Sequence, residues 1–372
     1  MKNFKIKSYC KINLSLRVIK KLNNNYHNII SLITFCDLHD VISISKTRSS
    51  RDKISFSGKF KKGINKKSNT VTKILNLLRG AKLLESQTFK IKSYCKINLS
   101  LRVIKKLNNN YHNIRSLITF CNLHNIILIS KIKSSKDKIS FSGRFKKGIN
   151  KESNTVTKIL NLLRGSKLLE NQTFKINIQK NIPHGSGLGG GSSNAADLLN
   201  YFNSKMKLKL NKKELKQLAK QIGFDVPISL ERQNTLLTGK KDEILRLNQK
   251  FKLNLLIVYP NFICSTERIY KKNKKISLCK PQSFFHVQNN KKLINILKNE
   301  NNDLEEAVIK IYPKVKKIIE YIKSIKGCYF SRITGSGSAC IGIFSNMKNA
   351  IYARKLIKLK YPNYWCVVSK TI

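Results

Sequence analysis

The feature that most constrains the fold is a run of fourteen residues, 183–196, that contains five glycines. Because this run carries few side chains, its main-chain N–H groups are open to a ligand. It follows an alternating stretch, residues 173–178, that predicts a strand, and it leads into residues 194–202, which predict a helix. Unpaired N–H groups and the helix dipole both favour an anion, so this order predicts a phosphate-binding loop.

Other glycine-rich motifs fit this run poorly. No Lys-Ser or Lys-Thr pair follows the last glycine, as a Walker A loop requires. No strand-loop-helix unit opens the chain, and no acidic residue follows about twenty positions on at a strand end, as a dinucleotide fingerprint requires. A flexible Gly/Ser linker is the remaining alternative. A linker would not be bracketed by a strand and an apolar helix, and it would not carry a central leucine, Leu188.

The second feature is a tandem repeat. Residues 4–88 and 89–173 are nearly the same sequence, offset by 85 and differing at twelve positions. The tripeptide Phe-Lys-Ile opens both copies and recurs at Phe174, which suggests unequal recombination; removing one copy leaves 287 residues. Two near-identical copies do not resemble a stacked solenoid, whose end repeats usually differ. We therefore expect one ordinary enzyme with a duplicated N-terminal segment, residues 1–88.

The second copy is joined in the parent order to the glycine-rich run 183–196, which we call the glycine loop. We therefore expect the second copy to supply the native fold. Three fates stay open for the first copy: it is partly unfolded, it competes for the same place, or it is swapped between molecules. The copies have drifted, since Asp37, Asp40 and Lys67 correspond to Asn122, Asn125 and Glu152. The sequence leaves open which copy is active.

The net charge of +55 first suggests a nucleic acid or an anionic membrane as partner. The lysines are spread along the whole chain, however, and Lys, Asn and Ile are abundant together, as an AT-rich coding sequence would produce. We interpret the charge mainly as this bias and expect neither nucleic acid nor membrane as partner. The charge would still attract phosphorylated substrates.

The cysteines indicate a reducing environment. The nine cysteines form no CxxC, and no His/Cys cluster has zinc spacing, so we expect no metal held by protein side chains. Most lie in apolar strand-like contexts, which is typical of reduced core residues in a cytoplasmic protein. No apolar run of about 18 residues predicts a membrane helix, and the first residues lack the apolar stretch of a signal peptide.

The pattern of elements predicts an α+β protein. With 41% hydrophobic residues the chain can bury a substantial core, and its length suggests two domains. Before Pro260 we expect a strand or a bent pair of strands at 89–103, strands at 116–121, 126–130, 138–142 and 253–258, helices at 153–164 and 212–222, and a hairpin at 236–247 turning over 239–242. After Pro260 we expect helices at 291–298, 303–324 and 347–359 and strands at 329–333, 339–344 and 364–369. We therefore expect domains at 89–260 and 261–372, the latter with helices on one face of an antiparallel sheet.

Three blocks together resemble the GHMP kinases. They are Ser-Tyr-Cys-Lys-Ile-Asn-Leu at 93–99 (also at 8–14), the glycine loop, and Ser-Arg-Ile-Thr-Gly-Ser-Gly-Ser at 331–338. The resemblance covers the whole 287-residue length and implies the two-domain fold of that family, with a ribosomal protein S5 domain 2-like N-terminal domain and a ferredoxin-like C-terminal domain. Tyr111-His112 and Phe-Asp-Val-Pro at 224–227 imply a kinase whose small-molecule substrate is a cytidine diphosphate-linked methylerythritol.

The resemblance also implies roles for individual residues. Asp225 would accept the proton of the substrate hydroxyl, and Lys96, or Lys11 in the first copy, would lie beside it and steady the charge on the transferring group. The loop would wrap the ATP phosphates, with Ser192 and Ser193 near the phosphates or Mg2+. The ATP-binding set is Pro183, His184, Gly185, Ser186, Gly187, Leu188, Gly189, Gly190, Gly191, Ser192, Ser193 and Asn154, and the substrate-binding set is Tyr111, His112 and Thr266.

Each of these residues has a plainer structural interpretation. Asp225 could cap a helix, Asn154 and Thr266 lie near helix starts where such residues are favoured, and Lys96 could be a solvated lysine on the polar face of a strand. Tyr-His at 111–112 could be a turn pair, and residues 334–338 a tight loop between strands.

The leading hypothesis is an ATP- and Mg2+-dependent kinase for the 2-hydroxyl of this methylerythritol, acting as a monomer or homodimer. A nucleic-acid-binding protein would instead show steeply salt-dependent binding. A third hypothesis, a decaying enzyme misfolded by its two competing copies, is tested by deleting residues 4–88.

Overall fold

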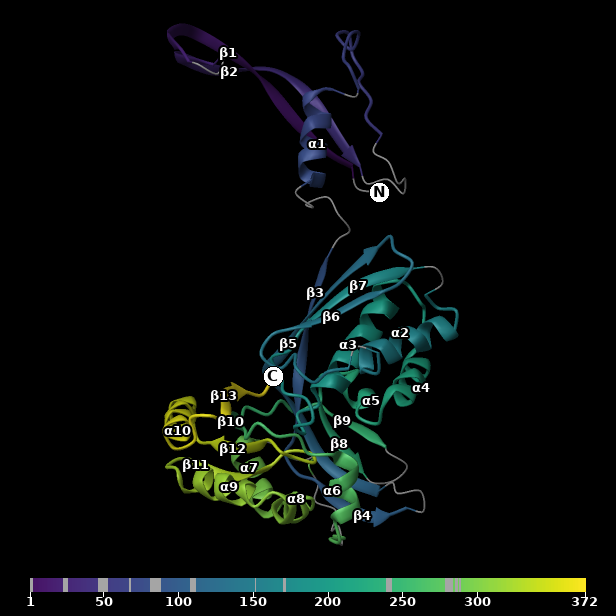
Figure 1. The fold of residues 1–372 in the computed structure, drawn as a ribbon, viewed down its shortest axis with the longest axis vertical. Helices are drawn as coiled ribbons and strands as arrows, with labels where there is room; N and C mark the ends of the chain where they lie inside the picture. The colour runs from purple at the N-terminus through teal and green to yellow at the C-terminus, as the bar shows by residue number, and fades with distance from the viewer. Residues whose placement is uncertain are drawn as a thin grey trace. The chain divides into compact units, whose positions relative to one another are not determined.

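The computed structural model describes residues 3–22, 26–45, 53–66, 68–80, 88–107, 112–150, 152–169, 172–238, 243–277, 284, 287 and 289–372. The chain forms two compact units, Met1–Glu85 (unit 1) and Ser86–Ile372 (unit 2); in Figure 1 unit 1 runs from purple to blue and unit 2 from blue to yellow. Across these residues, no helix is both long and apolar enough to span a membrane.

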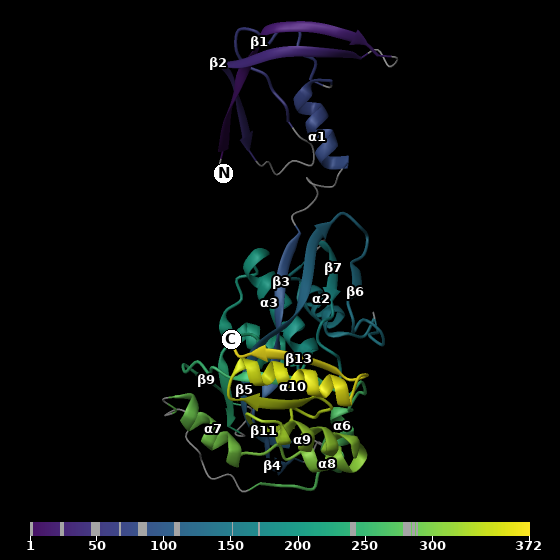
Figure 2. The ribbon, with the colours of Figure 1, turned by 90° about the vertical axis from the view of Figure 1, so that its left-hand side faces the viewer.

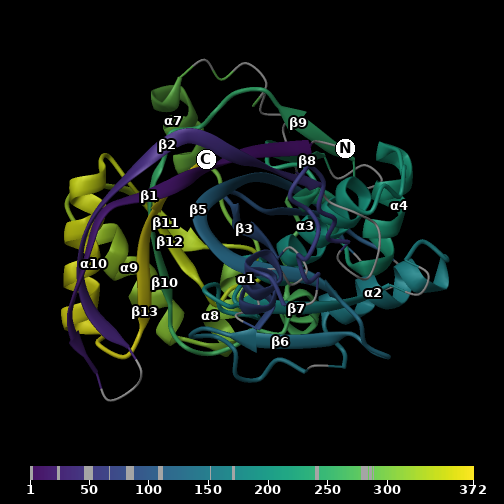
Figure 3. The ribbon, with the colours of Figure 1, turned by 90° about the horizontal axis from the view of Figure 1, so that it is seen from above.

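Unit 1 consists of the first copy of the repeat. Strands β1 (Asn3–Lys21) and β2 (His27–Ser45) pair antiparallel, as the long twisted ribbon in Figure 3 shows, and helix α1 (Thr70–Gly80) follows. Many of its large apolar side chains are exposed: Leu14 is 61% exposed and Phe35 is 68% exposed. A two-stranded ribbon has too little surface to bury its own apolar residues.

Unit 2 is built on a first sheet, the N-terminal sheet, whose described strands have the order β6-β7-β5-β8-β9, with β3 and β4 also paired to β5. Strands β6 and β7 are parallel, and the other pairs are antiparallel. The strands are β3 (Phe89–Asn98), β4 (Arg102–Lys106), β5 (His112–Ile132), β6 (Lys138–Ser142), β7 (Thr173–Gln179), β8 (Asn234–Thr238) and β9 (Ile244–Leu247).

Helices α2 (Thr155–Gly165), α3 (Gly190–Lys205) and α4 (Lys212–Ile222) lie together on one side of this sheet, and the short α5 (Val226–Ser229) follows them (Figure 1). Apolar residues of α2 recur at helical spacing and are buried with Ile127 and Ile129 of β5. Asn211 and Glu214 form a capping box at the start of α4, and Gly223 ends that helix.

A second sheet, the C-terminal sheet, has the order β11-β12-β10-β13 with every pair antiparallel. Its strands are β10 (Asn254–Tyr259), β11 (Cys328–Ile333), β12 (Cys340–Phe344) and β13 (Trp365–Lys370). The remaining helices are α6 (Thr266–Lys272), α7 (Asn290–Asn299), α8 (Glu305–Ile311), α9 (Lys314–Ser324) and α10 (Met347–Lys360). Helices α9 and α10 pack on one face of this sheet, as Figure 2 shows.

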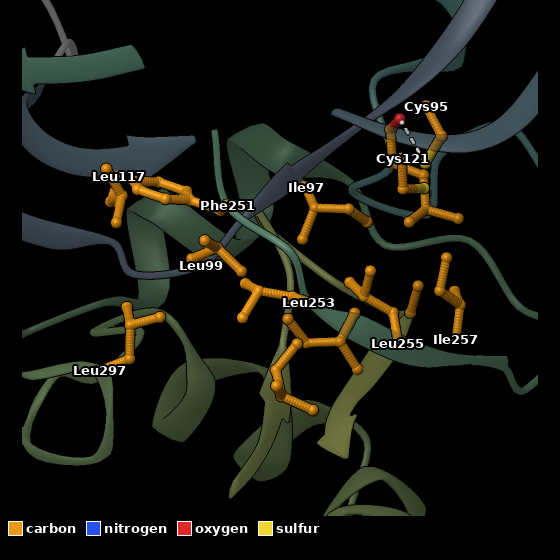
Figure 4. Close-up of a cluster of buried hydrophobic side chains, with 14 of the residues drawn as sticks. Cys95, Ile97, Leu99, Leu117, Cys121, Phe251, Leu253, Leu255, Ile257 and Leu297 are labelled. Carbon is orange, nitrogen blue, oxygen red and sulfur yellow. Dashed lines mark hydrogen bonds between the residues drawn. The ribbon is translucent and has the colours of Figure 1, made fainter. Parts of the chain in front are cut away.

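The other face of the C-terminal sheet packs against the N-terminal sheet through the apolar cluster in Figure 4. Side chains alternate along β10, so that Leu255 and Ile257 enter this cluster while Leu256 and Val258 face α9 and α10. Strand β10 therefore belongs to the C-terminal sheet. The domain boundary expected at Pro260 would have assigned this strand to the N-terminal domain.

The expected α+β architecture is confirmed, and the differences are local. Residues 89–103 form a bent pair of strands, β3 and β4, one of the two expected forms. The helix expected over 303–324 is two helices, because Pro313 cannot donate a backbone hydrogen bond within a helix. The hairpin of β8 and β9 is present, and its turn, residues 239–242, lies outside the described residues.

Candidate active site

The glycine loop joins β7 to α3, and α3 begins at Gly190, four residues earlier than the sequence predicts. Its N-cap is Gly189, which has a left-handed backbone with a φ of 64° and no side chain to cap the helix. Ser193 N–H donates to Gly189 O at 2.9 Å and closes the first turn. The N-terminal end of α3 is therefore suited to an anionic phosphate.

A turn of the C-terminal sheet supports this loop. Gly187 has a φ of +78°, and a Cβ added there would lie 2.0 Å from the carbonyl oxygen of Thr334. Ala339 N–H donates to Ser186 O at 3.1 Å, and Cys264 N–H donates to Gly185 O at 3.0 Å. The turn at 334–338 is thus a partner of the glycine loop as well as a connection between β11 and β12.

Lys96 and Asp225 form an ion pair directly beneath the loop. The distance from Lys96 Nζ to Asp225 Oδ2 is 2.9 Å, and the lysine side chain is 4% exposed while the aspartate side chain is 45% exposed. Lys96 N–H donates to Leu188 O at 3.1 Å, and a Cβ on Gly189 would come within 2.9 Å of Lys96 Cβ. Asp225 occupies the N-cap position of α5, but its side chain accepts no capping hydrogen bond. Its carboxylate is instead paired with Lys96 and is partly exposed to solvent.

The alternation of β3 explains why Lys96 lies there. Cys95, Ile97 and Leu99 enter the cluster between the sheets, which turns Lys96 and Asn98 to the opposite face. Lys96 Nζ also donates to Asn98 Oδ1 at 3.1 Å, and Asn98 N–H donates to the hydroxyl of Thr334 at 2.9 Å. Sequence analysis did not assign Asn98 a role, although its spacing of two residues from Lys96 was a usable signal.

Asn125 is a second residue that sequence analysis did not assign to the site. It is buried, and its side-chain oxygen accepts the N–H groups of Asn181 and Ile182, both at 2.9 Å, just before the loop begins. Its amide donates to Asn194 Oδ1 at 3.0 Å, within α3. One side chain thus fixes the entry to the loop relative to the helix that leaves it.

Two aromatic rings, one from β5 and one from α6, lie close together in unit 2. The His112 ring of β5 lies 4.9 Å from the Tyr270 ring of α6, centroid to centroid. Burial and, secondly, the negative charge of Asp225 raise the pKa of Tyr270. The expected partner of His112, Tyr111, lies outside the described residues. Nothing in the sequence spacing connected Tyr270 with His112.

Asn154 and Thr266, two other residues predicted for the site, lie at or near helix starts. Asn154 caps α2, since its side-chain oxygen accepts the N–H groups of Val156 and Thr157; its contact with ATP stays a prediction. Ser265, rather than Thr266, caps α6. The Thr266 hydroxyl lies 2.9 Å from the Ser336 hydroxyl, which brings it to the turn that supports the loop.

Two basic groups lie where the glycine loop begins. Lys180 is 3% exposed, and burial lowers its pKa to about 8. Burial and the nearby charge of Lys180 lower the pKa of His184. Lys11, the first-copy equivalent of Lys96, is exposed on β1 of unit 1, so in this arrangement the second copy supplies the lysine that meets Asp225.

Acidic and metal-binding side chains are sparse here. Among the residues whose placement is described, no group of three or more His, Cys, Asp or Glu side chains could hold a metal ion. The eight cysteines in that same set are free thiols.

Comparison with known proteins fits this geometry. Residues 154–232 match the model of the GHMP kinases N terminal domain, and residues 284–361 match that of the GHMP kinases C terminal. A 4-diphosphocytidyl-2-C-methyl-D-erythritol kinase of Pelagibacter ubique is 41% identical over 286 residues, which are 77% of this chain and 99% of that protein. The enzyme of the same name from Caldanaerobacter subterraneus is 32% identical, over 76% of this chain and 96% of that protein.

Solved structures share the fold. A crystal structure of 4-(cytidine 5'-diphospho)-2C-methyl-D-erythritol kinase aligns with a TM-score of 0.61 at 20% identity, over 76% of this chain and 99% of that one. A homoserine kinase from Cytophaga hutchinsonii aligns with a TM-score of 0.57 at 16% identity, over 77% of this chain and 95% of that one. The chain belongs to the GHMP kinases, in the family of the 4-diphosphocytidyl-2-C-methyl-D-erythritol kinases.

Proposed function

We propose that this protein transfers the γ-phosphoryl group of ATP to the 2-hydroxyl of 4-diphosphocytidyl-2-C-methyl-D-erythritol, with Mg2+ as cofactor. The observation that carries the proposal is the 2.9 Å ion pair between Lys96 and Asp225 directly beneath the glycine loop. Phosphoryl transfer depends mostly on positioning and charge stabilisation, and this pair places a proton acceptor and a cation next to a phosphate-binding helix start.

Asp225 is the group that accepts the proton of the substrate hydroxyl. Its carboxylate is 45% exposed, so one oxygen can receive a hydroxyl proton while the other stays with Lys96. A base in hydrogen-bond reach of the hydroxyl contributes roughly 10²–10⁴-fold to the rate. Lys96 holds that carboxylate in place, and its charge stabilises the negative charge that develops on the transferring group.

The loop residues hold the nucleotide. The start of α3 after Gly189 offers its first N–H groups to phosphate oxygens. Ser192 and Ser193 offer hydroxyl oxygens in the same turn, and oxygen donors are what Mg2+ prefers, usually together with substrate phosphates rather than a protein cage. These residues fit a magnesium ion that arrives with ATP and, when bound, neutralises charge on the β- and γ-phosphates.

His112 and Tyr270 form the wall for the cytosine base. Their rings are adjacent, and the charge of Asp225 acts on Tyr270; the base would lie on these rings with the sugar alcohol directed toward the carboxylate. Stacking of a base on an aromatic ring contributes about 1–3 kcal/mol. Tyr111 is proposed as the second stacking ring, Thr266 as a substrate-side hydroxyl and Asn154 as a residue of the adenine side. The free thiols fit a reducing compartment, the cytoplasm.

The purified chain should convert ATP and the cytidine-linked alcohol into ADP and a 2-phosphate monoester, followed by phosphorus NMR. Homoserine and mevalonate serve as competing alcohols. Turnover of either of these with none of the cytidine-linked substrate would refute the substrate assignment, and turnover of no alcohol would refute the kinase assignment.

A further inference from the structure

The first copy exposes residues that its twin buries. Leu14 is 61% exposed, whereas its counterpart Leu99 is fully buried. Phe35 is 68% exposed, whereas its counterpart Phe120 is 2% exposed. What buries the second copy is the rest of unit 2, residues 174–372, which we call the frame. The surface that complements the first copy is therefore present in every molecule.

The two strands of the first copy already pair in the register that the frame accepts. In unit 1, Cys10 pairs with Cys36 after a register shift at the preceding residue; in unit 2, Cys95 pairs with Cys121 after the same shift. Helices α1 and α2 have identical sequences. The strands need no new register to enter the frame.

The sequence differences between the copies avoid the core. The structure describes the second-copy residue at eleven of the twelve differing positions, and Asn125 alone among those eleven is buried. Its counterpart is Asp40, whose carboxylate can still accept the N–H groups of Asn181 and Ile182, the two shortest bonds made by Asn125. Every apolar core position of the described second copy is thus the same residue in the first.

We propose that the frame of a second copy of this chain takes residues 4–88 in place of its own residues 89–173, and that Lys11 then pairs with Asp225 across the two molecules. Exchange leaves one copy outside each frame, so the buried apolar area is almost unchanged, and the entropy cost of joining two molecules makes the exchanged arrangement the minor one. The choice is made during folding, when both copies are still unfolded. Exchange within one chain would close residues 89–173 into a loop, at an entropy cost that grows only slowly with loop length, so the dependence of recovered activity on protein concentration separates this route from exchange between molecules.

The test uses two inactive chains and rests on the kinase activity proposed above. One chain carries Lys11→Ala and Lys96→Ala with an intact frame, and the other carries Asp225→Asn with both lysines. Unfolded together and refolded as a mixture, they should recover about 1–10% of wild-type activity, the population of a minor state, and recovery should rise with protein concentration. Adding Lys11→Ala to the second chain should abolish recovery, whereas adding Lys96→Ala should not.

Two further substitutions in the Asp225→Asn chain test whether recovery of activity requires the first copy to pack into the frame of the other molecule. Phe35→Asp places a carboxylate at a position that is buried in the frame, and Ser43→Asp places one where the counterpart, Leu128, is 37% exposed. Both residues are exposed in unit 1. Phe35→Asp should reduce recovered activity at least ~10-fold, while Ser43→Asp should leave it unchanged, because only the first position enters the core.

A capture experiment tests the exchange without any activity. A tagged chain of residues 86–372, the length at which whole relatives align, is refolded with the untagged full chain, and recovery of the full chain on the tag is measured. Capture that Phe35→Asp abolishes and Ser43→Asp preserves supports the exchange even if wild-type turnover fails. No capture, recovery that depends on Lys96 instead of Lys11, or concentration-independent activity of the Lys96→Ala chain alone would overturn exchange between molecules.

Discussion

Gly187→Ala should uncouple the glycine loop from the turn that supports it. A methyl group at this position would lie 2.0 Å from Thr334 O, so the two segments must separate by roughly 1 Å. That movement strains two hydrogen bonds of 3.1 Å, from Ala339 N–H to Ser186 O and from Gly337 N–H to Thr334 O. Each contributes about 1 kcal/mol, and the left-handed backbone adds about 1–2 kcal/mol for a residue with a Cβ. The expected loss of unfolding free energy is therefore about 3–4 kcal/mol.

Urea unfolding measures this loss, and the KM for ATP reports the displaced loop. Gly165→Ala is the matched control, because Gly165 lies in the last turn of α2 with a normal φ and nothing within 4 Å of the added methyl group. The control should be unchanged or more stable by up to about 1 kcal/mol. If both variants unfold at the same urea concentration and have the same KM for ATP, the turn at 334–338 does not hold the glycine loop in place.

Three further predictions follow from the site. Asn125→Leu should lower the free energy of unfolding, measured in urea, by about 3 kcal/mol, because it leaves the N–H groups of Asn181 and Ile182 without their acceptor. Asn125→Asp should lower it clearly less; equal losses would contradict the role of the acceptor. Lys180 has a folded pKa of about 8 against 10.5 when unfolded, so the unfolded state holds more protons between these values and stability should rise with pH by about 3 kcal/mol across that window. Lys180→Met should flatten this rise in a pH series of unfolding curves, and an unchanged rise would assign it to another group. Tyr270→Leu should raise the KM for the cytidine-linked substrate about 5- to 150-fold while Tyr270→Phe stays near wild type, and an unchanged KM would remove Tyr270 from the base site.

Local pattern was enough to predict much of the fold. The apolar spacing and end signals of α4 gave both of its bounds, because its capping residues lie within its own sequence. The same logic placed Lys96 on the polar face of a strand, since Cys95 and Ile97 flank it. The start of α3 was missed by four residues because glycines disfavour helix, and here packing overrides that preference: Gly190 lies against Ile182, where a Cβ would meet that side chain at 2.9 Å.

Contacts between distant segments could not be predicted from spacing. Asn98 meets Thr334, which is 236 residues away, and His112 meets Tyr270; both contacts exist only because the two sheets pack face to face. The role of Asp225 came from the family resemblance, and it was the structure that separated a lysine-paired carboxylate from a helix cap. The exposed first copy was equally inaccessible, because the same sequence is buried when the frame is present and exposed without it.

The single-turnover rate of Asp225→Asn with saturating ATP and cytidine-linked substrate is the measurement closest to the central claim. The account predicts a rate lower by about 10²–10⁴-fold, with an unchanged urea midpoint. Glu231→Gln is the control, since its side chain is 44% exposed, much as that of Asp225 is, but lies 3.9 Å from Arg246 instead of near Lys96. A phosphoryl-transfer rate for Asp225→Asn that matches the control would show that this carboxylate does not accept the proton.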